Sequence, residues 1–527
     1  MGSAPCWQRR GVLVDRWRGM EVDMERQTLG FGRVRKWRVT ALAVAGGAAL
    51  AAAGLGAQAA TESTFGTVLQ TNLVSDLAGA AQLQDPNLVN PWGISSSSGS
   101  PFWVSDNNAG VATLYSSHNG ATPVSIVPLV VSIPTPVDST GAGGAPTGTV
   151  FNPNAGKGAF TVSGVNAQNL PASAGALFLF STEDGTITGW NPGVNPVGFT
   201  PAKAGTYSII GVDNSGNNFT NPDPNQQTGG VYKGLAIATS ATPIAAGDGD
   251  STSLLYASNF RAGTVDVYDS KFKPVTSLPA GAFTDSGLPH GYAPFDVQVL
   301  GAKVYVTYAL QNATRHDDKA GNHRGFVDVF NLDGTPGGPH GARRLISRGQ
   351  LDSPWGLAIA PAGFAGISAT GSDQVLLVGN FGNGQINAYD ASTGSFVGGL
   401  RDPDGETISI DGLWAIRVGN GGNGGAANTV YFTAGLLGER HGLFGSLTTA
   451  TPGSPEGPAE AQWAQANLDV VQLDQSQLTI DAAAGAPAAT INRDVQTLEA
   501  DSDGLARAER AFAEDAADDA GVKPAET

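Results

Sequence analysis

The sequence predicts an all-β protein, a six-bladed β-propeller, and three observations carry that prediction. The 527 residues include 73 Gly and 31 Pro but only 14% charged residues, which is typical of short strands joined by tight turns. A unit of three short strands recurs six times between about residues 90 and 447, at a spacing of roughly 60 residues. One such unit cannot bury both of its faces alone, whereas six units packed around an axis can.

The first strand of each unit carries the most regular part of the repeat. The clearest copies begin at Asn90 (NPWGI), Lys233 (KGLAI) and Ser353 (SPWGLAI). Less regular copies begin at Pro146, Ala293 and Asp411. Glycine in this strand lets neighbouring backbones approach closely, so we expect the first strand of every unit to be the innermost strand of its blade, beside the central channel.

A strand that belongs to no unit precedes the first one. Residues Gly66–Val74 (GTVLQTNLV) have the apolar content of a strand. We predict that this strand pairs with Gly442–Leu447 as the outer strand of the last blade. That pairing closes the ring and protects a sheet edge. The predicted propeller therefore spans residues 60–447.

Residues 1–59 are typical of an N-terminal extension with a signal peptide. Basic residues at 33–38 precede the uncharged apolar stretch Val39–Leu55, and Ala57-Gln58-Ala59 is a small-residue cleavage site. The extension is long, so the start codon is Met1, Met20 or Met24. We expect cleavage after Ala59, a secreted or periplasmic protein, and no membrane span in the mature chain.

Charge and cysteine content exclude several classes of partner and site. The chain has a formal charge of −17, and residues 1–59 contribute nine Lys or Arg against four Asp or Glu, so the remainder carries −22. Such acidity argues against nucleic acid and against anionic membranes as partners. The single cysteine, Cys6, lies in the extension, so the mature chain has no disulfide and no cysteine-based metal site.

The C-terminal part, residues 448–527, differs from the propeller. Pro452, Pro455 and Pro458 mark a linker, and the Ala-rich tail that follows is strongly acidic. A helical face is formed by Ile491, Val495, Leu498, Leu505 and Phe512. The tail is either an acidic appendage with some helix or a helix that docks on a partner.

Several motifs point to a particular family. NPWGI, STEDGTITGW and GNFGNGQINAYD resemble motifs of an uncharacterised family of exported bacterial propeller-like proteins, and the resemblance covers about residues 65–447. More distantly, the units are similar to NHL-repeat six-bladed propellers. The resemblance implies the propeller fold, but the close family carries no established activity. The wider group includes lactonases, amidating lyases and binding proteins, so the fold does not decide the function.

Acidic and amide side chains recur where propeller loops converge on the channel mouth. They are Asp106, Glu183, Asp184, Asn259, Asn380 and Asp411, with Asp296 on an inner strand. A ring of such oxygen ligands suits Ca²⁺, and Asp106, Glu183, Asp296 and Asp411 are the candidate metal ligands. The competing interpretation is that these residues cap turns through nearby backbone amides.

Two further groups are candidates for chemistry or binding. His316 and Asp317 lie in a long loop of the fourth unit, and a His beside carboxylates can act as a general base; with Glu183 they are the catalytic candidates. Trp92, Trp355 and Trp414 occupy matching positions in three units. They either stack on a ligand or form the core between blades.

We therefore predict an exported, soluble propeller that acts as a binding or structural scaffold. Its partner would be a small molecule, a glycan or an envelope protein. No nucleotide, serine-hydrolase or zinc-protease motif is present. The alternative is a hydrolase or lyase assisted by Ca²⁺ at the channel mouth, so the question of catalysis stays open at this stage.

Overall fold

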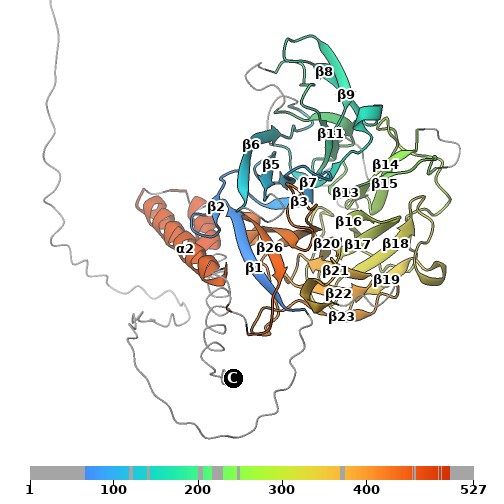
Figure 1. Ribbon diagram of the computed structural model, residues 1–527. Helices are drawn as coiled ribbons and strands as arrows, with labels where there is room; N and C mark the ends of the chain where they lie inside the picture. Colours follow the sequence, from blue (N-terminus) through green and yellow to red (C-terminus); the bar gives the residue numbers. More distant parts are fainter. Residues whose placement is uncertain are drawn as a thin grey trace, which may run out of the picture. The chain divides into compact units, whose positions relative to one another are not determined.

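Six sheets of three to five strands are arranged around a common axis in the computed structural model, and Figure 1 shows them as the blades of a propeller. The structure describes residues 66–498 apart from gaps at 118–122, 139–142, 200–205, 217–228, 246–249, 368–373, 454, 456–458, 485 and 488. The predicted signal peptide, its cleavage site after Ala59 and the tail beyond residue 498 lie outside these residues. The six-bladed fold that the sequence predicts is confirmed.

The blades follow one another in chain order. The first blade contains β3 (Pro91–Ser95), β4 (Phe102–Asp106), β5 (Val111–Ser116) and β6 (Ser125–Ser132). The second contains β7 (Pro146–Phe151), β10 (Phe178–Thr182), β11 (Thr186–Trp190) and β12 (Ile209–Asp213). The third contains β13 (Tyr232–Thr239), β14 (Ser253–Asn259) and β15 (Thr264–Tyr268). The fourth blade contains β16 (Tyr292–Leu300), β17 (Lys303–Leu310), β18 (Phe326–Asn331) and β19 (Arg344–Ser347). The fifth contains β20 (Pro354–Ile359), β21 (Val375–Asn380), β22 (Ile386–Asp390) and β23 (Phe396–Gly399). The sixth contains β24 (Leu413–Val418), β25 (Val430–Gly435) and β26 (His441–Thr449).

The first strand of each blade is the innermost one, as the repeat predicts. Contacts run from β3 to β7, β13, β16, β20 and β24 in turn, and then from β24 back to β3. The six inner strands therefore form a closed ring around the axis.

The last blade also contains the first strand of the chain. Strand β1 (Val68–Ser75) pairs antiparallel with β26, with Val68 opposite Thr449 and Ser75 opposite Leu443. This is the pairing that the sequence predicts, and Figure 1 shows the two strands side by side. A short strand, β2 (Leu83–Gln84), adds to the outer side of β1.

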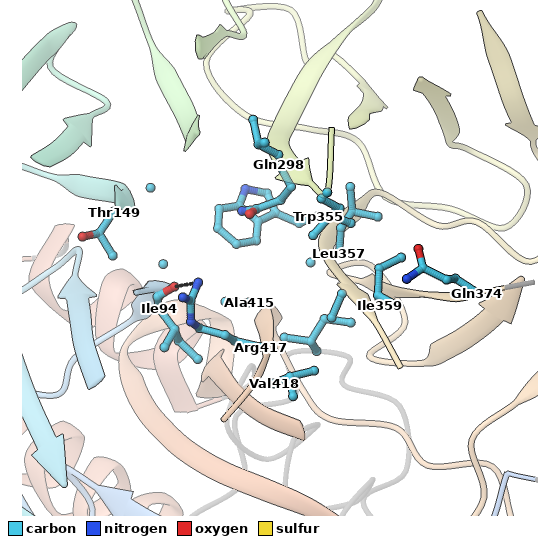
Figure 2. Close-up of a pocket in the computed structure, with 18 residues that line it drawn as sticks. Ile94, Thr149, Gln298, Trp355, Leu357, Ile359, Gln374, Ala415, Arg417 and Val418 are labelled. Carbon is cyan, nitrogen blue, oxygen red and sulfur yellow. Dashed lines mark hydrogen bonds between the residues drawn. The ribbon is translucent and has the colours of Figure 1, made fainter. Parts of the chain in front are cut away.

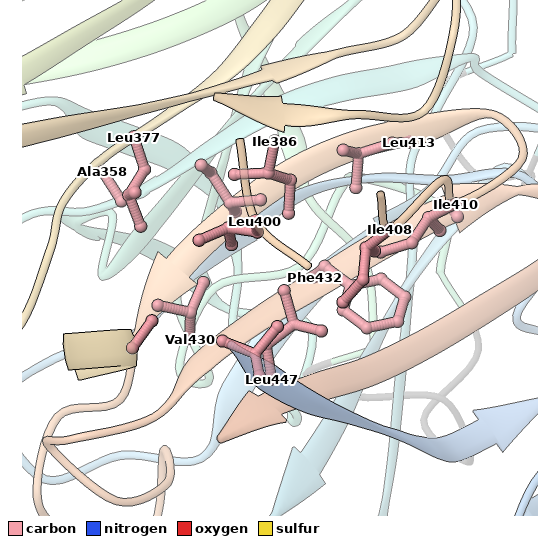
Figure 3. Close-up of a cluster of buried hydrophobic side chains, with 14 of the residues drawn as sticks. Ala358, Leu377, Ile386, Leu400, Ile408, Ile410, Leu413, Val430, Phe432 and Leu447 are labelled. Carbon is pink, nitrogen blue, oxygen red and sulfur yellow. The ribbon is translucent and has the colours of Figure 1, made fainter. Parts of the chain in front are cut away.

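Apolar side chains fill the space between neighbouring blades. Figure 3 shows one such cluster, in which Leu377 and Ile386 of the fifth blade meet Leu413 and Phe432 of the sixth. All four are fully or almost fully buried. Burial of each such side chain stabilises the fold by about 1.5–3 kcal/mol. The one cysteine of the chain, Cys6, lies outside the described residues, so the inter-blade contacts hold these residues without a disulfide.

A break in strand pairing recurs near the start of all six inner strands. The register shifts after Pro91 in β3, after Pro294 in β16 and after Pro354 in β20, with equivalent shifts in β7, β13 and β24. Bulges of this kind re-aim the side chain at the break. The first residues at the six breaks are Trp92, Thr147, Lys233, Phe295, Trp355 and Trp414, and we call these the axial positions.

Hydroxyl groups on the second strands satisfy the backbone freed by these breaks. The Gly148 amide donates to Ser181 Oγ at 3.1 Å, and the Asp296 amide donates to Thr307 Oγ1 at 2.9 Å. In the last blade the Ala415 amide donates to Thr433 Oγ1 at 3.1 Å. Thr433 in turn donates to the carbonyl of Trp92, which ties the sixth blade to the first.

Three features of the fold did not follow from the repeat. A hairpin of β8 (Thr161–Val165) and β9 (Pro171–Gly175) is inserted in the second blade, and a short α1 (Leu436–Glu439) lies between β25 and β26. In the tail, α2 (Ala459–Ala483) contacts β1, and Val470 packs into the cluster of Figure 3. Among the helices described, none has the length and apolarity needed to cross a membrane.

Residues 489–498 form a second helical segment in the tail. It contains Ile491, Val495 and Leu498 of the predicted helical face. Leu505 and Phe512 lie outside the described residues.

The close approach of the inner strands can be tested at Gly148. A Cβ atom there would lie 2.3 Å from the backbone nitrogen of Leu235 in the next blade, whereas a Cβ at Gly156 would meet nothing within 4 Å. We expect Gly148→Ala to lower the free energy of unfolding in urea by about 1–3 kcal/mol, because backbone must move. Gly156→Ala should stay within about 0.5 kcal/mol of the wild type. Equal effects of the two changes would contradict the inner-strand packing.

Candidate functional site

Aromatic rings from four blades meet at the axis. Trp92 and Trp414 stack with ring centroids 3.4 Å apart, and Trp355 meets both rings edge-on at 6.1 and 5.8 Å. Phe295 lies 5.9 Å from Trp414. Each of the three tryptophans is only 1% exposed, so their rings face one another and not solvent.

Lys233 occupies the axial position of the third blade, where four other blades place an aromatic ring. Its side chain is 3% exposed, and its ammonium lies 5.0 Å from the centre of the Trp92 ring. The ammonium pairs with Glu183 of the second blade and lies 3.4 Å from Asp317 Oδ1 of the fourth. Burial alone would lower the pKa of Lys233, but the two carboxylates outweigh burial and raise it.

The loop between β17 and β18 brings His316 and Asp317 to the same place. Nδ1 of His316 lies 2.7 Å from Asp317 Oδ1 and 3.9 Å from Glu183 Oε1. Burial would raise the pKa of Asp317, but the hydrogen bond from His316 and the charge of Lys233 hold it well below its usual range. Asp317 is therefore ionised and accepts from Nδ1–H, which leaves Nε2 of His316 able to take a proton.

Glu439 and Asn90 extend this cluster from the sixth blade to the first. Asn90 Nδ2 donates to Glu439 Oε2 at 2.9 Å. Both residues have left-handed backbone, with φ of 49° at Asn90 and 68° at Glu439, a conformation that non-glycine residues seldom adopt. Burial raises the pKa of Glu439 to about 7, although the nearby charge of Lys233 acts in the opposite direction.

Asn107 completes the set of charged and amide groups that we call the axial cluster. Its Nδ2 donates to Glu183 Oε2 at 3.0 Å. The axial cluster consists of Asn90, Asn107, Glu183, Lys233, His316, Asp317 and Glu439. It lies where the inner strands begin, next to the loops that join the second and third strands of the blades.

The structure brings together the three residues proposed for catalysis, Glu183, His316 and Asp317, but it places the other predicted metal ligands elsewhere. Asp106 is buried within the first blade, and Asp296 is buried within β16; burial raises the pKa of each well above its usual value. Asp411 accepts a hydrogen bond from the Leu437 amide at 2.9 Å.

The remaining members of the predicted polar ring bond to backbone groups, at separations of 39, 3 and 30 residues along the chain. Asp184 Oδ2 accepts from the Ala145 amide at 2.8 Å. Asn259 accepts from the Ala262 amide at 3.2 Å, and Asn380 donates to the Gln350 carbonyl at 2.7 Å. These are the bonds of residues that hold turns and loops.

The axial cluster fits a calcium ion poorly. Of the residues that the structure describes, Glu183, His316 and Asp317 are the one group of three carboxylate or imidazole residues whose ligand atoms lie within 4.8 Å of one another. Calcium takes about six to eight oxygen ligands, whereas this group offers two carboxylates and an imidazole. The Lys233 ammonium also pairs with both carboxylates, so a cation would have to displace it.

Lys233 and Glu439 were not among the predicted site residues. The signal for Lys233 was present, because alignment of NPWGI, YKGLA and SPWGL places this lysine where other units have Trp. Glu439 gave no comparable signal, since its position depends on how the loop after β25 folds back toward Asn90.

Comparison with known proteins finds relatives in a giant virus. No protein-family model matches the chain. Uncharacterized protein L690 of Acanthamoeba polyphaga mimivirus is 30% identical over 387 residues, which cover 71% of this chain and 84% of that protein. Uncharacterized protein R648 of the same virus is 29% identical over 382 residues, which cover 71% of this chain and 78% of that protein.

One solved structure gives a distant likeness. A crystal structure of glucose dehydrogenase covers 72% of this chain and 98% of its own, with 9% identity and a TM-score of 0.38. A score this low carries no argument about chemistry, and the architecture rests on the six sheets described above.

The pKa of Glu439 gives a pH-dependent prediction. With a folded value near 7 and an ordinary value of 4.5, the folded state holds a proton that the unfolded state releases between these pH values. The stability of the wild type therefore falls as pH rises through this range, relative to a variant without the carboxyl group. We expect the melting temperature of Glu439→Gln minus that of the wild type to increase from pH 4.5 to 7.5. A constant difference would contradict the burial of this carboxyl group.

The poor fit to calcium gives a second prediction. Protein purified without chelators should contain no stoichiometric metal by elemental analysis, and EDTA should leave its melting temperature unchanged. Stoichiometric Ca²⁺ together with a large loss of stability in EDTA would show that a cation takes the place assigned here to the Lys233 ammonium.

Proposed function

The chain belongs to the family of the uncharacterized protein L690 of Acanthamoeba polyphaga mimivirus, and from that premise we propose that it is an exported β-propeller that binds a small hydroxyl-rich molecule at the axial cluster. Export is supported by the basic and apolar pattern of residues 1–59 and by the lack of cysteine after them. The ligand is either free or the end of a glycan.

The observation that carries the proposal is a charged residue at a position that packing would fill with an aromatic ring. Trp92, Phe295, Trp355 and Trp414 show what the fold accepts at the axial positions. Taking an ammonium out of water costs several kcal/mol, and pairing recovers that cost only with suitable partners. The chain supplies those partners from two other blades, and it holds Glu439 in strained backbone beside them.

The exposed side of the cluster indicates what it binds. Asp317 is 58% exposed and His316 31% exposed, whereas Lys233 and Glu183 lie deeper at 3% and 13%. Carboxylates and amide oxygens accept hydrogen bonds, and the imidazole and amide nitrogens donate them. A ligand with several hydroxyl groups can meet both kinds of group, because each hydroxyl donates and accepts.

A second candidate function is acid–base catalysis on such a ligand, as in a hydrolase or lyase. The observation that favours it is the 2.7 Å contact between His316 Nδ1 and ionised Asp317. This contact orients the ring so that Nε2 can act as a general base. Glu439, with a pKa of about 7, supplies a carboxyl group that can hold or release a proton near neutral pH.

Stability measurements can separate a binding role of the cluster from a purely structural one. Lys233→Met should lower the free energy of unfolding by about 3 kcal/mol, the loss typical of a broken buried ion pair, because the negative charge of Glu183 is left without a partner. The triple variant Lys233→Met, Glu183→Gln, Asp317→Asn should regain the stability of the wild type or exceed it. A triple variant that is less stable than Lys233→Met alone would indicate that the charges are there to hold the fold.

Binding is tested on the same variants with D-glucose, D-galactose and glycerol as probes. The wild type should bind at least one of them by calorimetry, and the stable triple variant should bind none. Arg344→Met is the matched control. It also removes a positive charge that is paired with a carboxylate, that of Asp328 at 2.7 Å, but this pair lies in the fourth blade, away from the axis. Absence of binding in the wild type, or binding that survives in the triple variant, would overturn the proposal. Turnover of a glycoside by the wild type but not by His316→Gln would select the catalytic candidate.

A further inference from the structure

The central channel contains a cavity on the other side of the aromatic rings. Its volume is about 450 Å³, and its wall comes from the inner strands β3, β7, β16, β20 and β24. Figure 2 shows Trp355 at this cavity, and the indole nitrogen of Trp355 donates to the Lys233 carbonyl at 3.1 Å. The axial cluster lies at the beginning of the inner strands, whereas the cavity continues along their later residues. The channel therefore has two separate regions.

The wall of this cavity combines polar groups with aliphatic side chains. Its apolar side chains come from four of the blades and include Ile94, Leu300, Leu357, Ile359, Ile416 and Val418. Gly301 and Gln374 at its border are exposed, so the cavity reaches the surface there. A volume of this size lies within the range of about 300–1,000 Å³ that is usual for sites of small organic ligands.

Arg417 is the one charged residue among those lining the cavity. Its two terminal nitrogens donate to the carbonyls of Ile94 and Ser96 at long distances of 3.4 and 3.3 Å, and Figure 2 shows the first of these bonds. Its Nε is buried and has no hydrogen-bond partner among the residues described. Burial lowers the pKa of Arg417 to about 10, so the guanidinium still carries its charge at neutral pH.

A purely structural role does not account for this arginine. The two long bonds connect β24 of the sixth blade to the region of β3 in the first, which a neutral donor could do equally well. A half-buried guanidinium that has no acidic partner among the described residues is unfavourable, because its charge is only partly hydrated and is not neutralised.

We propose that this cavity binds a small monocarboxylate with an apolar body, whose carboxylate pairs with Arg417 and whose body lies against the aliphatic wall. The planar guanidinium matches a carboxylate in charge and in geometry. Thr149 and Gln298 are further polar residues among those that line the cavity. This site is independent of the axial cluster, and the proposal does not rest on the proposed function.

The test compares octanoate with octanamide by isothermal titration calorimetry on the purified exported protein. The two probes have the same chain and differ in charge at the head group. We expect octanoate to bind more tightly, and we expect Arg417→Met to weaken octanoate binding about 10- to 100-fold, the range for hydrogen bonds to charged groups. Octanamide binding should change little. Arg348→Met, at an exposed arginine of the fourth blade, is the matched control and should bind octanoate like the wild type.

Several results would overturn the proposal. They are no octanoate binding by the wild type, equal affinity for the two probes, and an Arg417→Met variant that binds octanoate as the wild type does. If Arg417→Met no longer melts cooperatively, and so is not folded, the same titrations are done with Arg417→Lys. That variant keeps the positive charge without the planar fork and should still prefer octanoate to octanamide, with weaker binding than the wild type. If Arg417→Lys binds octanoate and octanamide with equal affinity, although it keeps the positive charge, that result would also contradict the proposed pairing.

Discussion

The close approach of six backbones at one axis is the constraint on which the rest of this structure depends. Each inner strand has room for a single side chain at its bulge, and the residue that follows is glycine in four of the six blades. A Cβ at Gly93, Gly148, Gly234 or Gly356 would lie 2.0–2.6 Å from an atom of the neighbouring blade. The axial side chains are therefore forced together, and their chemistry decides what the channel can do.

Two opposing requirements meet at these positions. Dense packing favours aromatic rings, and four blades follow that preference. Lys233 departs from it, and its ammonium then needs the carboxylates of Glu183 and Asp317, which in turn fix His316. The charged cluster on one side of the aromatic rings and the cavity with Arg417 on the other are consequences of the same geometry, since the rings divide the channel between them.

How much the sequence could predict depended on whether a feature is local. The blades, the inner position of the glycine-containing strand and the pairing of β1 with β26 followed from short patterns and from the repeat. The candidate ring of oxygen ligands combined residues that occupy different, non-equivalent positions in their repeat units. Asp106 corresponds to Thr182, because each pairs with the Pro at the start of the inner strand, and Glu183 corresponds to Asn107. Side chains one residue apart on a strand point to opposite faces, which separates Asp106 from the axial cluster. The position of Glu439 depends on a loop conformation that no short pattern encodes.

The central claim is that a charged lysine is buried at the axis and held by carboxylates from other blades. It can be tested most directly by NMR of the Lys233 side-chain nitrogen in selectively labelled protein. The account predicts an ammonium signal that persists to higher pH than that of a surface lysine, exchanges slowly with water and shifts in the Glu183→Gln variant. A Lys233 signal that exchanges as fast as that of a surface lysine and is unchanged by Glu183→Gln would show that the axial cluster does not exist in solution.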